Sequence, residues 1–357
     1  MKIAVTADAH LSTGDAHPER YRALEDVFKR TDKAGIENLI IAGDLFDKDS
    51  QNYSGFEDLC RRYPSVQLHI IPGNHDPNIT EKSITGHTVH IYRVPTVLEF
   101  DSVPFLFIPY EERTNMGERI AHQEHDLDGR HWVLVGHGDF YGGVSEPNPL
   151  EPGTYMPLSK KDLRRFKPGK VFLGHIHKPH SPDGDIVNYV GSPCGLDINE
   201  TGRRGFLVYD TTDGSTERHN VETDVLYFRE TFLVVPSDSE VPRLRMEIAE
   251  RIEFWDIDPF DHEKVQLRVE AKGYAKDRSA VLESLTRGFE GFSYFKGEEP
   301  NIKELSACPV DDHLEAISKR TMELIEELDW AFGGDEPTKE AVVLKALTVI
   351  YGQGDGR

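Results

Sequence analysis

The most informative stretch of the sequence is residues 38–47, Asn38-Leu39-Ile40-Ile41-Ala42-Gly43-Asp44-Leu45-Phe46-Asp47. Its first half is an apolar run of strand-forming residues, and its second half is a glycine followed by acidic residues that favour a turn. This order predicts a buried strand that ends in a polar loop. Taken alone, the loop could be an ordinary turn, so its meaning depends on whether the pattern recurs.

The same order of an apolar strand and then a short polar motif recurs along the chain. The other polar motifs are Asp8-Ala9-His10, Gly73-Asn74-His75-Asp76, Gly136-His137 and Gly174-His175-Ile176-His177. Amphipathic stretches such as residues 18–34 alternate with the strands, which predicts an α/β fold. Because open α/β sheets bind ligands beyond the carboxyl ends of their strands, we expect the motifs to converge on one site.

Separately, most of these motifs have an ordinary structural explanation. A lone Asp-x-His is more often a turn or a cap, and a lone His137 is more often a hydrogen-bonded core histidine. The motifs at residues 73–76 and 174–177 are more specific, since buried polar clusters need partners. All of the motifs together, in this order, predict a functional site.

The motifs offer carboxylates, imidazoles and an amide carbonyl, and no thiolate. This is the ligand set of a borderline divalent metal such as manganese, iron or zinc. Residues two apart in an extended segment point to the same side, so Asp8 with His10, and His175 with His177, are expected to point into the site together. Sharp backbone turns beside them are expected at Gly43, Gly73, Gly136 and Gly174.

The composition limits the class of protein. The 357 residues include 63 acidic and 41 basic side chains, and the formal charge of -22 argues against nucleic-acid binding by general surface attraction. This objection is limited, because charges are screened beyond about 8 Å at physiological salt. No window reaches the roughly twenty apolar residues that span a bilayer, so we expect neither a membrane protein nor a secreted one.

The cysteines indicate a reducing compartment. Cys60, Cys194 and Cys308 are far apart in the sequence and form no CxxC pair, so neither a disulfide framework nor a zinc knuckle is predicted. We therefore expect a cytoplasmic protein of the cell interior, with a phage-encoded protein also allowed.

The first α/β pattern of apolar and polar residues ends around residues 211–214, in a turn-rich stretch. A second pattern follows, with strands near residues 227–235 and 265–271 and helices from Pro242 and near residues 279–289. Apolar residues at helical spacing then predict two helices at the end of the chain. We expect three parts, at residues 1–215, 216–305 and 306–357.

The ordered series of motifs resembles the calcineurin-like metallophosphoesterases over residues 1–210. Within that superfamily, the segments similar to the SbcD-type DNA repair nucleases are Ala7-Asp8-Ala9-His10-Leu11, residues 43–47 and Tyr189-Val190-Gly191-Ser192-Pro193. The spacing from residue 136 to Arg204-Gly205-Phe206 is similar to the phage recombination endonuclease nuclease subunit. The resemblance implies a two-sheet sandwich flanked by helices, with residues 216–305 as a small α/β capping domain and residues 306–357 as a partner-binding helical tail.

The resemblance also implies roles for individual residues. One divalent ion would be held by Asp8, His10, Asp44 and His177, and the other by Asp44, Asn74, His137 and His175. Asp44 would bridge the two ions, and Mn²⁺ is the ion expected. His75 would be the catalytic acid and Asp47 the carboxylate that orients it. The segment after His137, residues 138–141, matches no family segment, so its contacts are left open.

The implied function is that of a DNA exonuclease or endonuclease in repair or recombination. Its implied partners are DNA, an ATPase of the structural-maintenance-of-chromosomes type bound by the tail, and a second copy of the chain in a homodimer. The local feature that favours DNA is the basic run Lys160, Lys161, Arg164, Arg165, Lys167 and Lys170, which could equally be a solvated helix face.

Two other functions compete with the nuclease. A phosphodiesterase or phosphomonoesterase of the same fold that acts on a small molecule is favoured slightly by the acidic surface. A scaffolding subunit with a vestigial site is opposed by the intact ligand positions. The sequence leaves open the cleavage polarity, the preference for ends, hairpins or strands, and any dependence on ATP.

Overall fold

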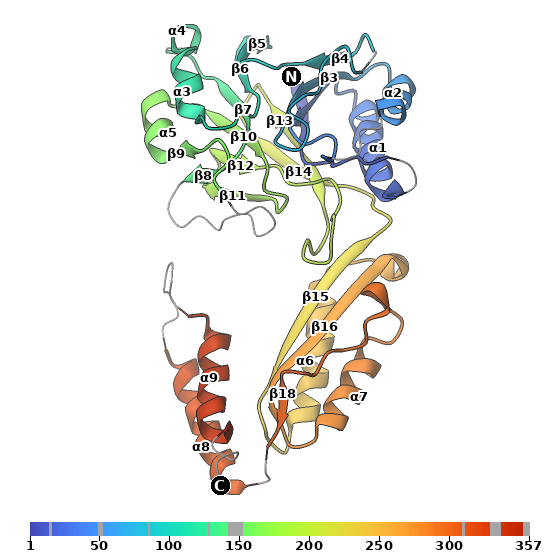
Figure 1. Ribbon diagram of the computed structural model, residues 1–357, viewed down its shortest axis with the longest axis vertical. Helices are drawn as coiled ribbons and strands as arrows, with labels where there is room; N and C mark the ends of the chain where they lie inside the picture. Colours follow the sequence, from blue (N-terminus) through green and yellow to red (C-terminus); the bar gives the residue numbers. More distant parts are fainter. Residues whose placement is uncertain are drawn as a thin grey trace. The chain divides into compact units, whose positions relative to one another are not determined.

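The computed structural model (Figure 1) describes residues 1–13, 16–48, 53–84, 86–127, 129–141, 153–308, 311–328 and 337–352. The chain divides into two compact units. The first contains Met1–Leu196 and Arg203–Val225, and the second contains Asp197–Gly202 and Leu226–Arg357.

The first sheet of unit 1 has six strands in the order β14-β13-β1-β2-β3-β4. The strands are β1 (Lys2–Thr6), β2 (Asn38–Ala42), β3 (Gln67–Ile71), β4 (Val89–Ile91), β13 (Gly205–Asp210) and β14 (Thr216–Asn220). Strands β1 to β4 pair in parallel, and β13 runs antiparallel to β1 and to β14. Every residue of β2 is buried, which explains why its sequence is a continuous apolar run without alternation.

The second sheet of unit 1 also has six strands, in the order β11-β12-β10-β7-β6-β5. The strands are β5 (Thr96–Phe100), β6 (Val103–Ile108), β7 (Val133–His137), β10 (Lys170–Gly174), β11 (His180–Asp183) and β12 (Val187–Tyr189). The inner strands are parallel, and the edge strands β5 and β11 are antiparallel to their neighbours. A separate short pair consists of β8 (Phe140–Tyr141) and β9 (Leu158–Ser159).

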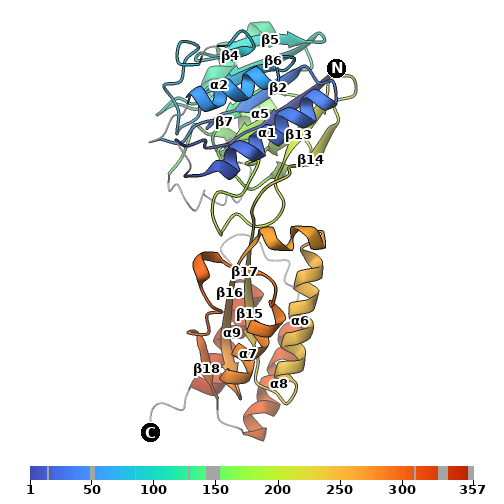
Figure 2. The same ribbon diagram turned by 90° about the vertical axis from the view of Figure 1, so that its right-hand side faces the viewer.

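Apolar side chains hold the two sheets face to face. Ile3 and Ile40 of the first sheet share one buried cluster with Phe105 and Phe172 of the second. Helices α1 (Pro18–Lys33) and α2 (Tyr53–Arg62) cover the other face of the first sheet, as Figure 2 shows. Helices α3 (Met116–Ala121), α4 (Glu124–Leu127) and α5 (Lys160–Phe166) pack beside the second sheet. The expected two-sheet sandwich flanked by helices is confirmed.

The first unit extends beyond the boundary expected at residue 215. Strand β14 begins at Thr216 and pairs with β13 over five residues, from Gly205 opposite Asn220 to Tyr209 opposite Thr216. The turn-rich stretch at residues 211–214 is therefore the turn of a hairpin within unit 1. A sequence pattern cannot distinguish such a hairpin turn from a linker, because both are rich in Gly, Asp and Thr.

Unit 2 is a parallel sheet with helices. It contains β15 (Leu226–Val234), α6 (Glu240–Phe254), η1 (Pro259–Lys264), β16 (Val265–Ala275), α7 (Arg278–Gly288), β17 (Ser293–Tyr294), η2 (Phe295–Gly297) and β18 (Leu305–Ala307). Strand β16 is central and alternates strictly between buried and partly buried residues. The buried residues pack with the apolar faces of α6 and α7, so this unit has its own core.

Both helices expected in the tail are present, as α8 (Asp312–Glu326) and α9 (Lys339–Tyr351). They belong to unit 2, because Leu347 and Tyr351 of α9 share a buried cluster with Tyr274 of β16. None of the helices in the described ranges combines the length and the apolar composition needed to cross a bilayer. Within these ranges no disulfide joins the three buried cysteines.

Candidate metal centre

The polar motifs meet where strands of both sheets end. The loop after β1 is joined to the loop after β2 by backbone hydrogen bonds, from Asp8 N to Gly43 O at 3.1 Å and from His10 N to Asp44 O at 3.0 Å. His137, at the end of β7 in the second sheet, reaches across to the first sheet, where its Nδ1 lies 2.9 Å from the Ala42 carbonyl oxygen. The predicted convergence of the motifs on one place is therefore observed.

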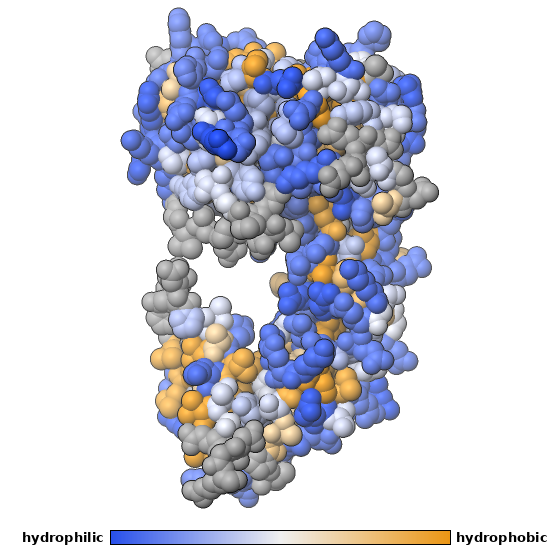
Figure 3. All heavy atoms as spheres, in the orientation of Figure 1, coloured by the Kyte–Doolittle hydropathy of each residue, from blue (hydrophilic) through white to orange (hydrophobic). Residues whose placement is uncertain are grey.

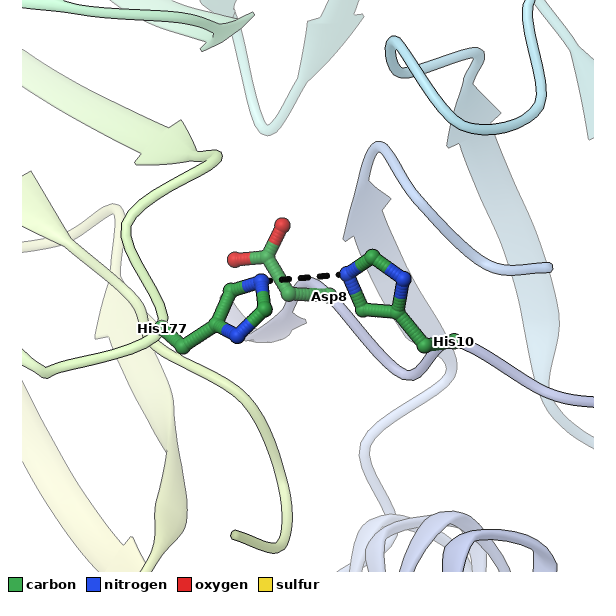
Figure 4. Close-up of side chains that lie close together, drawn as sticks. All are labelled: Asp8, His10 and His177. Atoms are coloured by element: carbon green, nitrogen blue, oxygen red, sulfur yellow. Dashed lines mark hydrogen bonds between the residues drawn. The ribbon is translucent and has the colours of Figure 1, made fainter. Parts of the chain in front are cut away.

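One group of side chains consists of Asp8, His10 and His177 (Figure 4). The Nε2 atoms of His10 and His177 lie 3.1 Å apart, and the Asp8 carboxylate lies beside both rings. One ligand atom from each of the three residues lies within 4.8 Å of the other two. This spacing suits three donors that share one cation.

A second group consists of Asn74, His137 and His175. The Asn74 Oδ1 atom lies 2.8 Å from His137 Nε2 and 3.2 Å from His175 Nδ1. The three residues come from the loop after β3, the end of β7 and the loop after β10. An amide oxygen and two imidazole nitrogens therefore point at one another, as donors to a second cation would.

Asp44 lies between the two groups. Its Oδ2 atom is 3.7 Å from His10 Nε2 in the first group and 3.3 Å from His137 Nε2 in the second. Both the Asp44 side chain and its two histidine neighbours are almost fully buried. Asp44 thus occupies the position from which one carboxylate could bind two ions, although the ligand assignment of each residue stays a prediction.

His75 lies beside His10 and Asp44, and one ligand atom from each of the three residues lies within 4.8 Å of the other two. Its Nδ1 atom is 3.1 Å from Asp47 Oδ1, and its side chain is 17% exposed, against 3% for His10 and 0% for His137. The hydrogen bond with His75 holds the pKa of the Asp47 carboxyl below its usual range, so Asp47 is ionised and His75 Nδ1 is the donor.

Strained backbone is concentrated in the cluster. Asp8, His10, Asp44 and His175 all have left-handed backbone conformations, with φ of 54°, 45°, 49° and 85°. Such conformations cost a residue other than glycine about 1–3 kcal/mol, and they gather at functional sites. The expectation that Asp8 and His10 share a side through strand-like alternation was therefore wrong, because tight left-handed turns bring these side chains together.

The glycines of the motifs are required mainly because neighbouring side chains lie too close to leave room for a Cβ atom. Of the four glycines expected at sharp turns, only Gly43 has positive φ, at 92°. A Cβ atom on Gly43 would lie 2.1 Å from His137 Nδ1, and one on Gly73 would lie 2.1 Å from Asp44 Oδ1. Any side chain at these two positions would displace a predicted ligand.

Burial and charge pairing change the pKa values of the cluster. Burial lowers the pKa of His10 to about 3, so its neutral imidazole can offer a lone pair. Burial raises the pKa of Asp8 to about 6. Burial also opposes the charged forms of Asp44 and His137, but their mutual attraction outweighs it. The pKa of Asp44 falls below its usual range, and that of His137 rises to about 9.

The unsatisfied carboxylate oxygen of Asp8 indicates that a cation fits this cluster. Its Oδ1 atom accepts a hydrogen bond of 2.9 Å from the His175 N–H, whereas its buried Oδ2 atom has no hydrogen-bond partner among the described residues. An unsatisfied buried carboxylate oxygen is costly, and a bound cation would satisfy it. The surrounding carboxylate, imidazole and amide donors suit manganese, iron and zinc alike. His and Asp residues thus form a cluster fit for two metal ions.

Several residues that support the cluster had no role in the sequence prediction. Asp76 is fully buried and accepts hydrogen bonds from Gly73 N at 2.7 Å and from Phe46 N at 3.0 Å, so it joins two of the motif loops. Its place in the motif at residues 73–76 was a signal for such a role. Asp139 Oδ1 lies 3.7 Å from His175 Nε2, which gives one contact for the segment left open at residues 138–141.

The basic run at residues 160–170 is partly neutralised. Lys170 is buried, and its Nζ atom lies 2.9 Å from Asp185 Oδ2 and 2.8 Å from the Asp185 carbonyl oxygen. Arg165 pairs with Glu124 at 3.1 Å, and Lys160 lies 3.7 Å from Asp183. Lys170 is therefore not available to a substrate, and the remaining charge of the run lies on and beside α5.

Comparison with known proteins identifies a matching family and several distant relatives. Residues 1–179 match the family model described as calcineurin-like phosphoesterase. Exonuclease subunit 1 of Enterobacteria phage T4 is 28% identical over 241 residues, which covers 61% of this chain and 67% of the phage protein. The SbcD subunit of nuclease SbcCD from Staphylococcus saprophyticus is 26% identical over 239 residues, with coverage of 56% of this chain and 63% of that protein.

The protein of the same name from Staphylococcus epidermidis is 26% identical over 248 residues, with coverage of 59% of this chain and 66% of that protein. The matched region therefore spans about two thirds of the length of these relatives.

Proposed function

The chain belongs to the calcineurin-like phosphoesterase family, and from this premise we propose that it is a two-metal nuclease that hydrolyses phosphodiester bonds in DNA. Support for the substrate comes from the distant relatives, one named an exonuclease subunit and the others nuclease subunits. We further propose that it acts in DNA repair or recombination.

The observation that carries the two-metal proposal is the position of Asp44. Its Oδ2 atom lies between His10 Nε2, which faces His177, and His137 Nε2, which faces Asn74. In this proposal Asp8, His10, Asp44 and His177 bind one ion, and Asp44, Asn74, His137 and His175 bind the other.

The charge of the site supports a phosphodiester substrate despite the acidic chain. Two divalent ions would bring a charge of +4, and the carboxylates of Asp8 and Asp44 would offset only half of it. The site would then carry a net positive charge and attract a phosphate anion. Bound there, the ions would supply Lewis acidity that favours loss of a proton from water and stabilises negative charge developing on the phosphate.

His75 is the proposed acid. Asp47 accepts the hydrogen bond from Nδ1, which orients the ring and leaves Nε2 as the proton carrier. Because His75 is more exposed than His10 and His137, its ring can reach a substrate held at the metal positions. We propose that Nε2 gives its proton to the departing sugar oxygen.

A small-molecule phosphodiesterase or phosphomonoesterase of the same fold is the second candidate. The pairing of Arg165 with Glu124 and the burial of Lys170 favour it, since both reduce the positive charge that could contact a DNA backbone. The candidates differ in what they cleave rather than in the metal cluster.

One assay separates the candidates. Purified protein with Mn²⁺ would be given end-labelled duplex DNA, single-stranded DNA and a chromogenic phosphodiester, with the Asp44→Ala variant as a control for contaminating nucleases. Shortened or nicked DNA supports the nuclease. Cleavage of the small ester alone supports the second candidate, and a protein that binds Mn²⁺ but cleaves nothing would support a scaffolding role.

The tail is the proposed site for a partner ATPase of the SbcC type. Figure 3 shows apolar residues gathered over α8 and α9. Ile317, Leu324 and Leu328 lie at helical spacing along α8 and its end, and are 40%, 47% and 51% exposed, while other apolar residues of the tail pack against β16. An exposed apolar stripe on a helix fits the groove or coiled coil of a helical partner. We also propose that the α/β part of unit 2, residues 226–305, acts as the capping domain expected at residues 216–305, and that the chain forms a homodimer.

Native mass spectrometry with the ATPase subunit tests the tail proposal. The Leu324→Glu variant, which introduces a charge into the stripe, should lose binding, as should a chain without residues 311–357. The matched control is Glu323→Gln, which changes the neighbouring exposed residue without adding a charge. Unchanged binding by both altered tails would contradict the proposal.

A further inference from the structure

Two buried arginines contact the backbone of the two histidines that face each other. Arg20 of α1 is 7% exposed, and its Nη1 atom donates a hydrogen bond of 2.7 Å to the His10 carbonyl oxygen. Arg204, next to the first residue of β13, is 3% exposed, and its Nη1 atom donates a hydrogen bond of 2.5 Å to the His177 carbonyl oxygen. Neither arginine belongs to the predicted ligand set.

Each arginine adds a side-chain hydrogen bond to a loop that main-chain hydrogen bonds also hold. His10 has a left-handed backbone, with its N–H bonded to Asp44 O and its carbonyl oxygen to Arg20. The carbonyl oxygen of His177 accepts two hydrogen bonds, one from Arg204 and one of 3.1 Å from Ser192 N. Each arginine therefore helps to fix the main chain from which an imidazole ring extends.

Arg20 has a second contact that ties it to the site. Its Nη1 atom lies 3.3 Å from Asp47 Oδ2, while the other carboxylate oxygen of Asp47 accepts the hydrogen bond from His75. A guanidinium can donate in fixed directions to a carbonyl and a carboxylate together, which the single ammonium of lysine does less well. Arg20 thus links the loop of His10 with the Asp47–His75 pair.

We propose that Arg20 and Arg204 are positioning residues that hold His10 and His177 at the spacing of a single cation, and so set the affinity of that one metal position. The proposal rests on the two-metal centre proposed above. It assigns no such effect at the other position, where Asn74 and His137 are held by different contacts, such as the hydrogen bond from His137 to Ala42.

The test is an Mn²⁺ titration of the full-length Arg20→Lys and Arg204→Lys variants. The EPR signal of free Mn²⁺ measures how much of the metal is bound. The wild-type protein should bind two ions, and each variant should bind one of them at least tenfold more weakly. In an Asp8→Ala background, which removes a ligand of the affected position, the same changes should leave the remaining affinity unaltered. The EPR spectrum of bound Mn²⁺ should also lose its spin-coupled component at concentrations where the wild-type protein is saturated.

The matched controls are Arg22→Lys and Arg218→Lys. Arg22 lies two residues from Arg20 on α1 and pairs with Asp224, and Arg218 donates a 3.0 Å hydrogen bond to the Val190 carbonyl oxygen. Both controls should bind Mn²⁺ as the wild-type protein does. Equal weakening of both ions, or no weakening, in the Arg20 and Arg204 variants would overturn the proposal.

Two further outcomes separate the possible failures. A variant whose metal-free form has lost the near-ultraviolet circular dichroism of the wild-type protein would show that the arginine serves the fold, which would overturn its positioning role. A wild-type protein that binds no Mn²⁺ at all would instead remove the proposed two-metal function, and the inference about the arginines with it.

Discussion

The Nε2 atoms of His10 and His177 lie 3.1 Å apart, although 167 positions separate the two residues in the sequence. Burial keeps His10 neutral at physiological pH, so its Nε2 atom can act as a lone-pair donor. Two imidazole nitrogens that face each other beside a buried carboxylate are arranged for a cation rather than for one another. The predictions below follow from this arrangement and from the contacts around it.

Replacing His75 by alanine should leave metal binding intact and reduce turnover by about two to four powers of ten, the usual scale for loss of an acid catalyst. The reason is that His75 is outside the proposed ligand set and its Nδ1 atom contacts Asp47. Steady-state cleavage of the preferred substrate, with Mn²⁺ content measured on the same sample, provides the check. The His90→Ala variant controls for loss of a histidine elsewhere. A fully active His75→Ala protein with bound metal would remove His75 as the acid.

Replacing Asp44 by alanine should weaken both metal positions, whereas replacing Asp8 by alanine should weaken only one. Asp44 contacts His10 of the first group and His137 of the second, whereas Asp8 also lies near Asp44 and His137 but is proposed as a ligand only of the ion shared with His10 and His177. Metal content after gel filtration in dilute Mn²⁺ gives the stoichiometry, and thermal unfolding reports the linked stability. A ligand at 100 times its Kd adds about 2.7 kcal/mol, so wild-type unfolding should shift by several degrees with Mn²⁺. Identical losses in the two variants would contradict a bridging Asp44.

Metal binding should release a proton at neutral pH. Without metal, Nδ1 of His137 bonds to Ala42 O while Nε2 faces Asp44 Oδ2 and Asn74 Oδ1, and the pKa of His137 is raised to about 9. His137 is therefore protonated at pH 7, and a cation at Nε2 must displace that proton. Below pH 9 the apparent affinity should rise with pH, by up to about tenfold per unit for one released proton.

Isothermal titration calorimetry in buffers of different ionisation enthalpy checks this prediction directly. The dependence of the measured heat on the buffer should correspond to about one proton released per protein at pH 7, and it should decline above pH 9. Binding heats that do not depend on the buffer at pH 7 would contradict the protonated state of His137.

Replacing Asp76 by asparagine should destabilise the fold by about 1–3 kcal/mol, because one amide oxygen cannot accept both hydrogen bonds and the amide NH₂ would face an N–H donor. Asp76 accepts from Gly73 N and Phe46 N and is fully buried. Urea unfolding of the metal-free protein measures the change. Asp58→Asn is the control, since the Asp58 side chain is 66% exposed, and it should stay within about 0.5 kcal/mol of the wild-type protein.

Much of the fold could be predicted from local sequence. The apolar run at residues 38–42 became the fully buried strand β2, and the polar motif after it lies at the carboxyl end of that strand. The reason is that burial and chain direction leave a periodic signal in neighbouring residues. The hairpin of β13 and β14 escaped prediction, because its turn has the composition of a linker and the pairing is set by the rest of the sheet.

The sequence by itself determined which side chains are available to the site, since each predicted residue lies in a short motif after an apolar strand. Only the tertiary structure decided how these residues are grouped, that Asp8 and His10 are brought together by left-handed turns, and that Arg20 and Arg204 hold the backbone of His10 and His177. The physical reason is the distance along the chain over which each kind of interaction acts. Strand and turn preferences act between neighbours in the chain, whereas a contact across 167 positions exists only after both sheets have packed.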